Sequence, residues 1–420
     1  MRISTQHIFN LASTNMSNAN KEIYKTNEEI STGIRIRSAA DDPVAAIRIN
    51  SLNNYLDTID QYQKNVIAAE NSLALKEITL NSSMNILQRI EELAVQAGNT
   101  AVLSAAEYDD IAAEISNRTD ELLSLMNTQD PNGTYIFSGY QSETPAFSGN
   151  LVNGFEFEGD EGQTSVRVDT NTYVDISDSG KTLFVDVPSS QNTARATVPE
   201  TNRSNPAIEM TTPMVVDQEA YDEFYPEDMV IRFNEDSNIT PAAKNFTITE
   251  RSTGKVLLAD QPYVSGGEVI VGGLSFEMSG TPVSSNTGQN NGDQVFIDSS
   301  DTQDTMVTIQ KFYNALKTYD GSSDMRESLE QAIGDTITNI SNAQENINQA
   351  LTSIGARNNT LESVKNLHAD TKLVTQEVLS DLRDTDYAEA TTRLSAQTFV
   401  LQATQASFLT IRDLNLISQI

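Results

Sequence analysis

The chain of 420 residues contains no cysteine and no tryptophan, and its only histidines are His7 and His368. Without cysteine the chain can form no disulfide, no thiolate metal site and no cysteine nucleophile. Two histidines leave little material for imidazole-based acid–base or metal chemistry. The absence of cysteine fits a protein that crosses from the cytosol to the exterior without oxidative folding.

Long apolar runs and an excess of positive charge are also missing. No stretch approaches the roughly 20 apolar residues that span a bilayer. The first 30 residues lack the charged segment and apolar run of roughly 7–15 residues that mark a secretory signal. The formal net charge is −32, whereas nucleic-acid binding needs a basic surface. We therefore expect no membrane span and no nucleic-acid partner, and a chain that is either cytosolic or exported without such a signal.

Motifs that carry enzyme chemistry are absent too. The sequence contains neither glycine-rich phosphate loop, GxGxxG or GxxxxGK[ST], and no HExxH zinc motif. The pair Asp41-Asp42 could ligate a cation, but a helix cap is favoured because Pro43 follows it. We expect no enzyme activity, no catalytic residue, no metal site and no cofactor.

Glycine, proline and acidic residues gather in the middle of the chain. Residues 131–300 hold 15 of the 20 glycines and 10 of the 11 prolines. Residues 130–300 carry a net charge of −18, whereas each flank carries −7. The flanks are therefore expected to be helical, and the middle to be β-rich with a solvated acidic surface.

The first long helix is predicted from Pro43 to Ala97 by a heptad pattern. Of 14 positions in two heptad columns 12 are apolar, where a chain with 38% hydrophobic residues would give about five. Such a pattern is typical of a coiled-coil seam. The columns are Leu52, Ile59, Val66, Leu73, Leu80, Leu87 and Ala94, and Tyr55, Tyr62, Ala69, Lys76, Ser83, Ile90 and Ala97.

Further helices follow. A capping box at Ser104–Glu107 predicts a helix that ends near Asp130, and residues 306–316 predict a short one. A return rod repeats every seven residues at Ile333, Ile340, Ile347, Ile354 and Leu361. We expect this stripe to shift phase near Gly355 and to continue through Leu367 and Val374. His368 is interpreted as a residue accommodated in the seam and not as a ligand.

Both chain ends carry amphipathic helices of their own. Isolated helices of this kind are marginal in water because their apolar seam has no partner. We therefore expect the tails to need each other, or a neighbouring subunit, to become ordered. The predicted assembly interface consists of Phe9, Met16, Ile23, Ile30, Leu394, Leu401, Phe408 and Ile411.

Strand patterns occupy the middle of the chain. Leu151–Phe157 is predicted to be a hairpin around Asn153-Gly154, and residues 269–276 a hairpin around Gly272-Gly273. Further strands are expected at 183–187, 229–233, 245–250 and 295–297. Residues 188–213 are expected to form a loop.

Both ends of the chain resemble the flagellin superfamily. Residues 30–43, ISTGIRIRSAADDP, resemble its N-terminal signature, with Asp41, Asp42 and Pro43 at the start of a helix. Residues 380–390, SDLRDTDYAEA, and 401–408, LQATQASF, are similar to its C-terminal helix. The opening MRIST and residues 130–140, DPNGTYIFSGY, resemble its hook–filament junction members more than its filament subunits. The ending LNLISQI departs from the Leu-Ser-Leu-Phe-like ending usual in the family.

The resemblance implies an α+β multidomain fold. Both chain ends would form a long antiparallel coiled-coil rod, with an inserted β-rich outer domain. The implied domains are a helical tail domain (1–40 with 385–420, disordered in the monomer), a rod domain (41–150 with 300–384, with a β-hairpin near 134–147) and the outer domain (151–299).

The resemblance also implies a function in motility. The chain would be a secreted structural subunit that joins hook to filament in the bacterial flagellum. Export would use the type III channel and a cytosolic chaperone. Expected partners are hook-associated protein 1, flagellin, the filament cap during assembly, and further copies of the chain in a ring or helix.

Three alternatives remain beside the junction function. A flagellin, or filament subunit, is the first. A cytosolic coiled-coil scaffold is disfavoured by the apolar seams at both extreme ends. A flagellin-like protein with an enzymatic outer domain is disfavoured because residues 131–300 contain neither histidine nor HExxH.

Overall fold

The computed structural model describes residues 2–99, 103–199, 201–286 and 292–417. The chain forms two compact units. The first contains both chain ends, inward to Val66 and Glu362, and the second is Ile67–Leu361. Their boundaries fall inside the helices α2 (Pro43–Ala97) and α6 (Ser323–Arg383). The predicted division at residues 40 and 385 is a different partition and stays a prediction.

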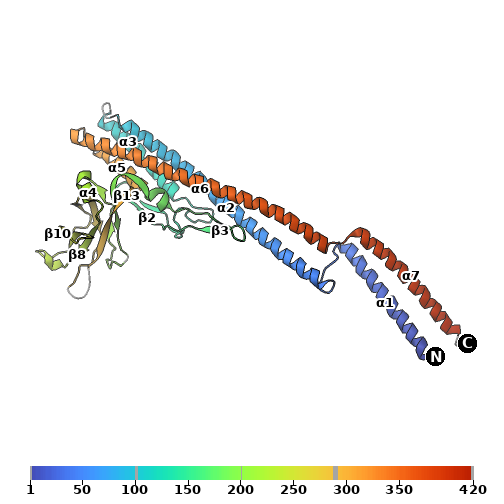
Figure 1. Ribbon diagram of the computed structural model, residues 1–420. Helices are drawn as coiled ribbons and strands as arrows, with labels where there is room; N and C mark the ends of the chain where they lie inside the picture. The colour runs from blue at the N-terminus through green and yellow to red at the C-terminus, as the bar shows by residue number, and fades with distance from the viewer. Residues whose placement is uncertain (1, 100–102, 200, 287–291, 418–420) are drawn as a thin grey trace. The chain divides into compact units, whose positions relative to one another are not determined.

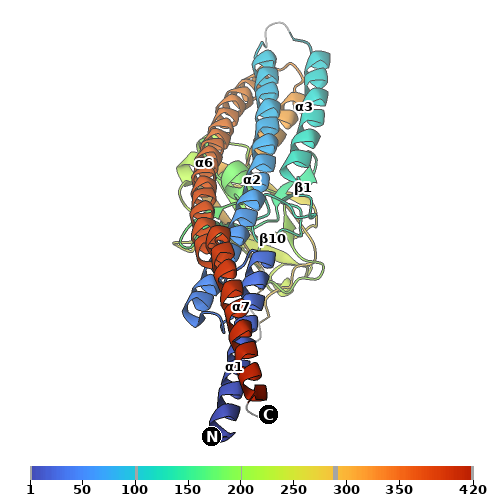
Figure 2. The ribbon, with the colours of Figure 1, turned by 90° about the vertical axis from the view of Figure 1, so that its right-hand side faces the viewer.

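The first unit is helical. The helices α1 (Arg2–Thr32) and α7 (Tyr387–Ile417) lie side by side, as both ribbon views show (Figures 1 and 2). The beginning of α2 packs against the end of α6, where Ile36, Ile49 and Leu379 form a buried cluster.

The second unit is built on the remaining parts of α2 and α6, which run antiparallel (Figure 1). The helices α3 (Ala105–Met126) and α5 (Thr305–Thr318) pack against each other beside them. The predicted heptad residues of this unit are buried: Leu73, Leu80, Leu87, Ile90, Ala94, Ile333, Ile340, Ile347, Ile354 and Leu361. This confirms the predicted α+β fold, with a long antiparallel coiled coil formed by both chain ends.

The predicted phase shift in α6 is wrong. Leu367 and Val374 are exposed, while His368 and Thr375 are buried. The positions 354, 361, 368 and 375 continue the heptad without a break, so the seam keeps its phase. The apolar pattern predicted a phase shift because the seam changes from apolar to polar residues at His368. The His368 ring stacks on the Tyr62 ring, with the ring centroids 5.9 Å apart.

The β-rich part of the second unit contains two main sheets. A five-stranded antiparallel sheet has the order β10-β9-β8-β13-β5, and a smaller sheet has the order β11-β12-β6 with β7 also paired to β12. Buried side chains from both sheets, among them Phe233, Ile248 and Phe276, form one cluster. The strands and the short helix among them are β5 (Val187–Thr197), β6 (Glu209–Met210), β7 (Met214–Val215), α4 (Gln218–Phe224), β8 (Met229–Phe233), β9 (Asn245–Glu250), β10 (Val256–Pro262), β11 (Gly267–Val271), β12 (Leu274–Ser279) and β13 (Gln294–Gln303).

Two small hairpins precede these sheets. They are β1 (Phe147–Asn150) with β2 (Gly154–Phe157), and β3 (Ser165–Arg167) with β4 (Tyr173–Asp175). The first differs from the prediction, because Leu151 is not in a strand but begins the turn. The side chain of Asn150 holds that turn by accepting hydrogen bonds from the N–H groups of Val152 and Asn153, both at 2.9 Å. Residues 134–146 contain no strand, so the hairpin expected near 134–147 is displaced to 147–157.

Some of the other predictions for the middle of the chain are confirmed and others are wrong. Residues 229–233 and 245–250 are β8 and β9, and Gly272-Gly273 joins β11 to β12 with both φ angles positive (53° and 79°). Residues 295–297 lie inside β13. The strand at 183–187 and the loop at 188–213 are wrong: residues 181–185 form a π-helix and residues 187–197 form β5. Pairing with β13 offsets the weak strand propensity of the small polar residues in β5.

In the part of the chain that the structure describes, we find no helix with the length and apolar character to cross a membrane.

Candidate assembly surface

Six of the predicted interface residues have described side chains, and all six lie on α1 or α7, the two helices that pair. The seam side chains are neither fully buried nor exposed: Met16, Ile23, Ile30, Leu394, Leu401 and Phe408. The side chains of Phe9 and Ile411 lie outside the described residues. Half-burial is expected of a seam between only two helices, because two helices cannot enclose a core.

Main-chain hydrogen bonds join the two tails where they meet the rest of the first unit. Gly33 accepts a bond from the Thr385 N–H at 2.9 Å, and the Arg35 N–H donates to the Arg383 carbonyl at 2.7 Å. Gly33 has a φ of +71°, and a Cβ there would lie 3.0 Å from the hydroxyl of Tyr387. Glycine is therefore favoured at this turn by the left-handed backbone conformation, and a Cβ would also require the Tyr387 hydroxyl to shift slightly.

Charged side chains add to this junction. Glu29 is buried and forms an ion pair with Arg393 of α7. Lys25 lies 3.2 Å from Asp41, and its hydrogen bond contributes most to holding the pKa of Asp41 below its ordinary value. The ion pair of Glu29 was not predicted from the sequence, because the position of a carboxylate in a helix does not show which residue of another helix it meets.

The residues predicted to start α2 do so. The Asp42 carboxylate accepts hydrogen bonds from the N–H groups of Val44 and Ala45, both at 3.0 Å, and Pro43 is the first helical residue. Asp42 is thus a helix cap. Asp41 instead accepts bonds from the Ser38 N–H and hydroxyl, both at 3.2 Å. Within the described ranges no three His, Asp or Glu side chains gather closely enough to share a metal ion.

Exposed apolar side chains are concentrated in the first unit. Among the described residues, half of the large exposed hydrophobic side chains lie in this unit, although it holds fewer than a third of the residues. Tyr24 of α1 and Phe399 of α7 are 73% and 71% exposed. This exposed apolar surface is available for contact with another protein.

A charged cluster that the sequence did not reveal lies in the second unit. Lys76, one of the two polar residues in the heptad columns of α2, has only 1% of its side chain exposed. Its Nζ lies 3.6 Å from the carboxylate of Asp178, and Arg357 of α6 donates two hydrogen bonds of 2.9 Å to the same group. Burial lowers the pKa of Lys76 to about 8 against the attraction of Asp178. The cluster joins the two rod helices to the segment that follows β4.

Comparison with known proteins agrees with this arrangement. Residues 3–142 match the family described as the bacterial flagellin N-terminal helical region. Flagellar hook-associated protein 3 of Escherichia coli K12 is 32% identical over 192 residues, which are 45% of this chain and 58% of that protein. A Bacillus subtilis flagellin is 32% identical over 141 residues, 33% of this chain and 46% of the flagellin. Hook-associated protein 3 of Legionella pneumophila has a similar solved structure, with a TM-score of 0.53 and 25% identity over 80% of this chain and 98% of that one.

In its helical ends, its inserted β-rich part and its N-terminal match the chain is similar to proteins of the flagellin superfamily. Among them it is similar to flagellar hook-associated protein 3. The alignment spans 58% of the length of the curated relatives of that name.

Proposed function

We propose that the chain is a structural subunit of the bacterial flagellum that joins the hook to the filament, without catalysis. The observation that carries the proposal is the concentration of exposed apolar side chains in the unit formed by both chain ends. The names of the similar proteins in E. coli and L. pneumophila support the choice of the hook-associated class.

The proposed mechanism couples folding to assembly. The α1 and α7 seams, with Phe9 and Ile411 at their outer ends, would be disordered in the monomer and buried when a subunit docks. Half-buried Ile23 and Leu401 support this idea, because a two-helix pair leaves much of its apolar surface in water. Burial against a neighbour would offset the entropy lost on ordering the tails.

The proposed location and partners follow from this function. The chain would be exported through the flagellar type III channel, kept unassembled in the cytosol by a chaperone, and become extracellular. It would contact hook-associated protein 1 on one side, flagellin on the other, its own copies laterally, and the filament cap during growth. The acidic middle of the chain supports an exposed position, because like charge keeps outer surfaces apart.

A flagellin is the second candidate function. The 32% identity to the B. subtilis flagellin favours it, although over fewer residues than the match to hook-associated protein 3. The two proposals differ in whether the cell makes a separate filament protein.

Deletion of the gene separates them. A junction protein predicts cells that build hooks, carry no filaments and release unpolymerised flagellin into the medium, with filaments restored by a plasmid copy. Cells without filaments and without any released filament protein would instead make this chain the flagellin. Normal filaments in the deletion strain would overturn both proposals.

A further inference from the structure

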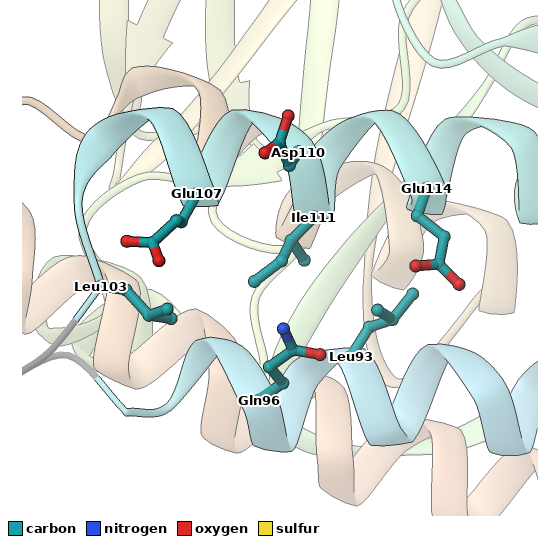
Figure 3. A pocket seen from close by; sticks show the side chains of 7 residues that line it. All are labelled: Leu93, Gln96, Leu103, Glu107, Asp110, Ile111 and Glu114. Atoms are coloured by element: carbon teal, nitrogen blue, oxygen red, sulfur yellow. The ribbon is translucent and has the colours of Figure 1, made fainter.

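A hollow in the second unit lies between the C-terminal part of α2 and the first half of α3. Its volume is about 180 Å³. Figure 3 shows Leu93 and Gln96 of α2 and Ile111 of α3 directed into the space between the two helices, with Glu107 and Glu114 on its α3 side. The hollow therefore combines apolar walls with an acidic rim.

The charges around the hollow are unbalanced. Residues 88–114 contain six Asp or Glu and a single Arg. That arginine, Arg89, is paired with Glu92 and Glu114, and Glu107 is held by Ser104. Asp110 is exposed at the edge of the hollow, where Figure 3 draws its carboxylate on the side of α3 turned away from α2, and it forms no ion pair with any residue that the structure describes. An apolar hollow beside an unpaired carboxylate suits a cationic side chain with an apolar neighbour.

A surface of that chemistry lies at the other end of α2. Val44 and Ile47 are 78% and 69% exposed, and Arg48 beside them is also exposed. Among the described residues Arg48 has no ion-pair partner. Residues 33–56 contain three Arg against two Asp, so this stretch is positive in a chain whose net charge is −32.

We infer that this positive surface (Val44, Ile47 and Arg48) docks into the hollow of a second copy of the chain, with Arg48 paired to Asp110. The inference deepens the proposed function by naming one contact between subunits. The two surfaces are different, so one copy can use both at once, and repetition of such a contact builds a ring or an open helix and not a closed dimer. Steering by opposite charges would bring the correct ends together in a population of strongly acidic chains.

The natural absence of cysteine gives a clean test, because introduced thiols meet no background. Full-length Ile47→Cys and Gln96→Cys chains are mixed under conditions where light scattering shows assembly, and joined with a short bismaleimide. We expect covalent dimers containing one copy of each. Lys64→Cys, exposed on the same helix but outside both surfaces, replaces Ile47→Cys in the matched control.

The outcomes separate this contact from the proposed function. If the chains assemble but the Ile47→Cys and Gln96→Cys pair cross-links no more than the control, the contact is wrong and the junction function stands. Cross-linking of unassembled chains to the same extent would equally overturn the contact. If the wild-type chain forms no assemblies with itself or on isolated hooks, the proposed function fails and the contact fails with it.

Charge reversal provides a second test that does not use cysteine. Arg48→Glu or Asp110→Arg alone should reduce assembly, and the double variant Arg48→Glu/Asp110→Arg should restore it. Added salt should weaken the wild-type contact, because exposed charges are screened over about 10 Å at 0.1 M. Two single variants that assemble normally, or a double variant no better than either, would overturn the pairing of Arg48 with Asp110.

Discussion

At the scale of single residues, the buried Lys76 and the partly buried Asp178 and Arg357 form a charged cluster between the two helices of the coiled coil. A polar residue in an apolar seam lowers stability but can specify which register two helices adopt. Here one carboxylate serves two cations, so the cluster carries an excess positive charge in a buried place. Removing the carboxylate and removing a cation should therefore have opposite consequences.

Asp178→Asn should lower the free energy of unfolding by about 3–5 kcal/mol, because the buried Lys76 and the partly buried Arg357 would lose their counter-charge. Lys76→Met keeps the length and apolar character of the stem, so it should leave stability unchanged or raise it by ~1–4 kcal/mol. Urea denaturation followed by circular dichroism measures both. Lys64→Met, an exposed position on the same helix, is the control and should change stability by less than about 0.5 kcal/mol. Equal losses for both cluster variants would contradict this account of the excess charge.

The same lysine predicts a pH dependence. Burial lowers its pKa in the folded chain to about 8, whereas the ordinary value of 10.5 applies when the chain is unfolded. Below pH 8 both states hold the proton and the folded state bears the full cost of the buried charge. Between pH 8 and 10.5 the folded state loses the proton while the unfolded state keeps it, so this group's contribution becomes less destabilising as pH rises, by at most roughly 3 kcal/mol.

The comparison of wild type with Lys76→Met isolates this effect, because every other titrating group is common to both chains. Any stability advantage of the variant should be largest near pH 7 and shrink by pH 10. A difference between the two chains that does not change over this range would show that Lys76 is not a buried cation.

At the scale of helices and strands, the spacing of apolar residues predicted the elements whose buried positions are apolar. It failed where polar residues occupy the buried positions. The bounds of α2, the cap at Asp42 and the capping box before α3 followed from local sequence because each depends on neighbours within a few residues. The seam of α6 beyond Leu361 and the strand β5 did not, since His368 and the small polar residues of β5 are positioned by partners far away in the chain.

The candidate assembly surface likewise has features that could be predicted from the sequence and features that could not. The seam columns of α1 and α7 could be read from their seven-residue spacing, whereas the Glu29–Arg393 pair and the exposure of Tyr24 and Phe399 depend on how the two helices are rotated against each other. One sequence holds no information on that rotation, because an amphipathic stripe fixes which face is inward and not which residues meet across it.

For the tail helices we predict that Ile23→Asp or Leu401→Asp blocks assembly and leaves the melting of the remaining helices and sheets unchanged. An added carboxylate in the seam must either stay in water or be buried unpaired, and both prevent docking. Light scattering reports assembly and circular dichroism reports melting. Ser17→Asp, exposed on α1, adds the same charge outside the seam and should assemble as the wild type does. Assembly by the Ile23 or Leu401 variant would show that the seam is not the docking surface.

At the scale of the whole molecule, the distribution of residues along the chain indicates which parts contact other subunits and which part faces solvent. The ends supply helices with unfilled apolar surface, and the middle supplies a β-rich insertion that carries most of the negative charge. An insertion of this kind between two halves of a rod suits a protein that assembles through its ends and faces solvent with its middle.

The most direct test of the junction function is where the chain lies on the cell. Antibody raised against residues 150–300 is applied to intact flagellated cells and located by immunogold electron microscopy, with cells lacking the gene as the control. Label confined to a narrow band where hook meets filament is the expected result. Label along the whole filament would make the chain a flagellin, and label found only inside broken cells would contradict a flagellar function altogether.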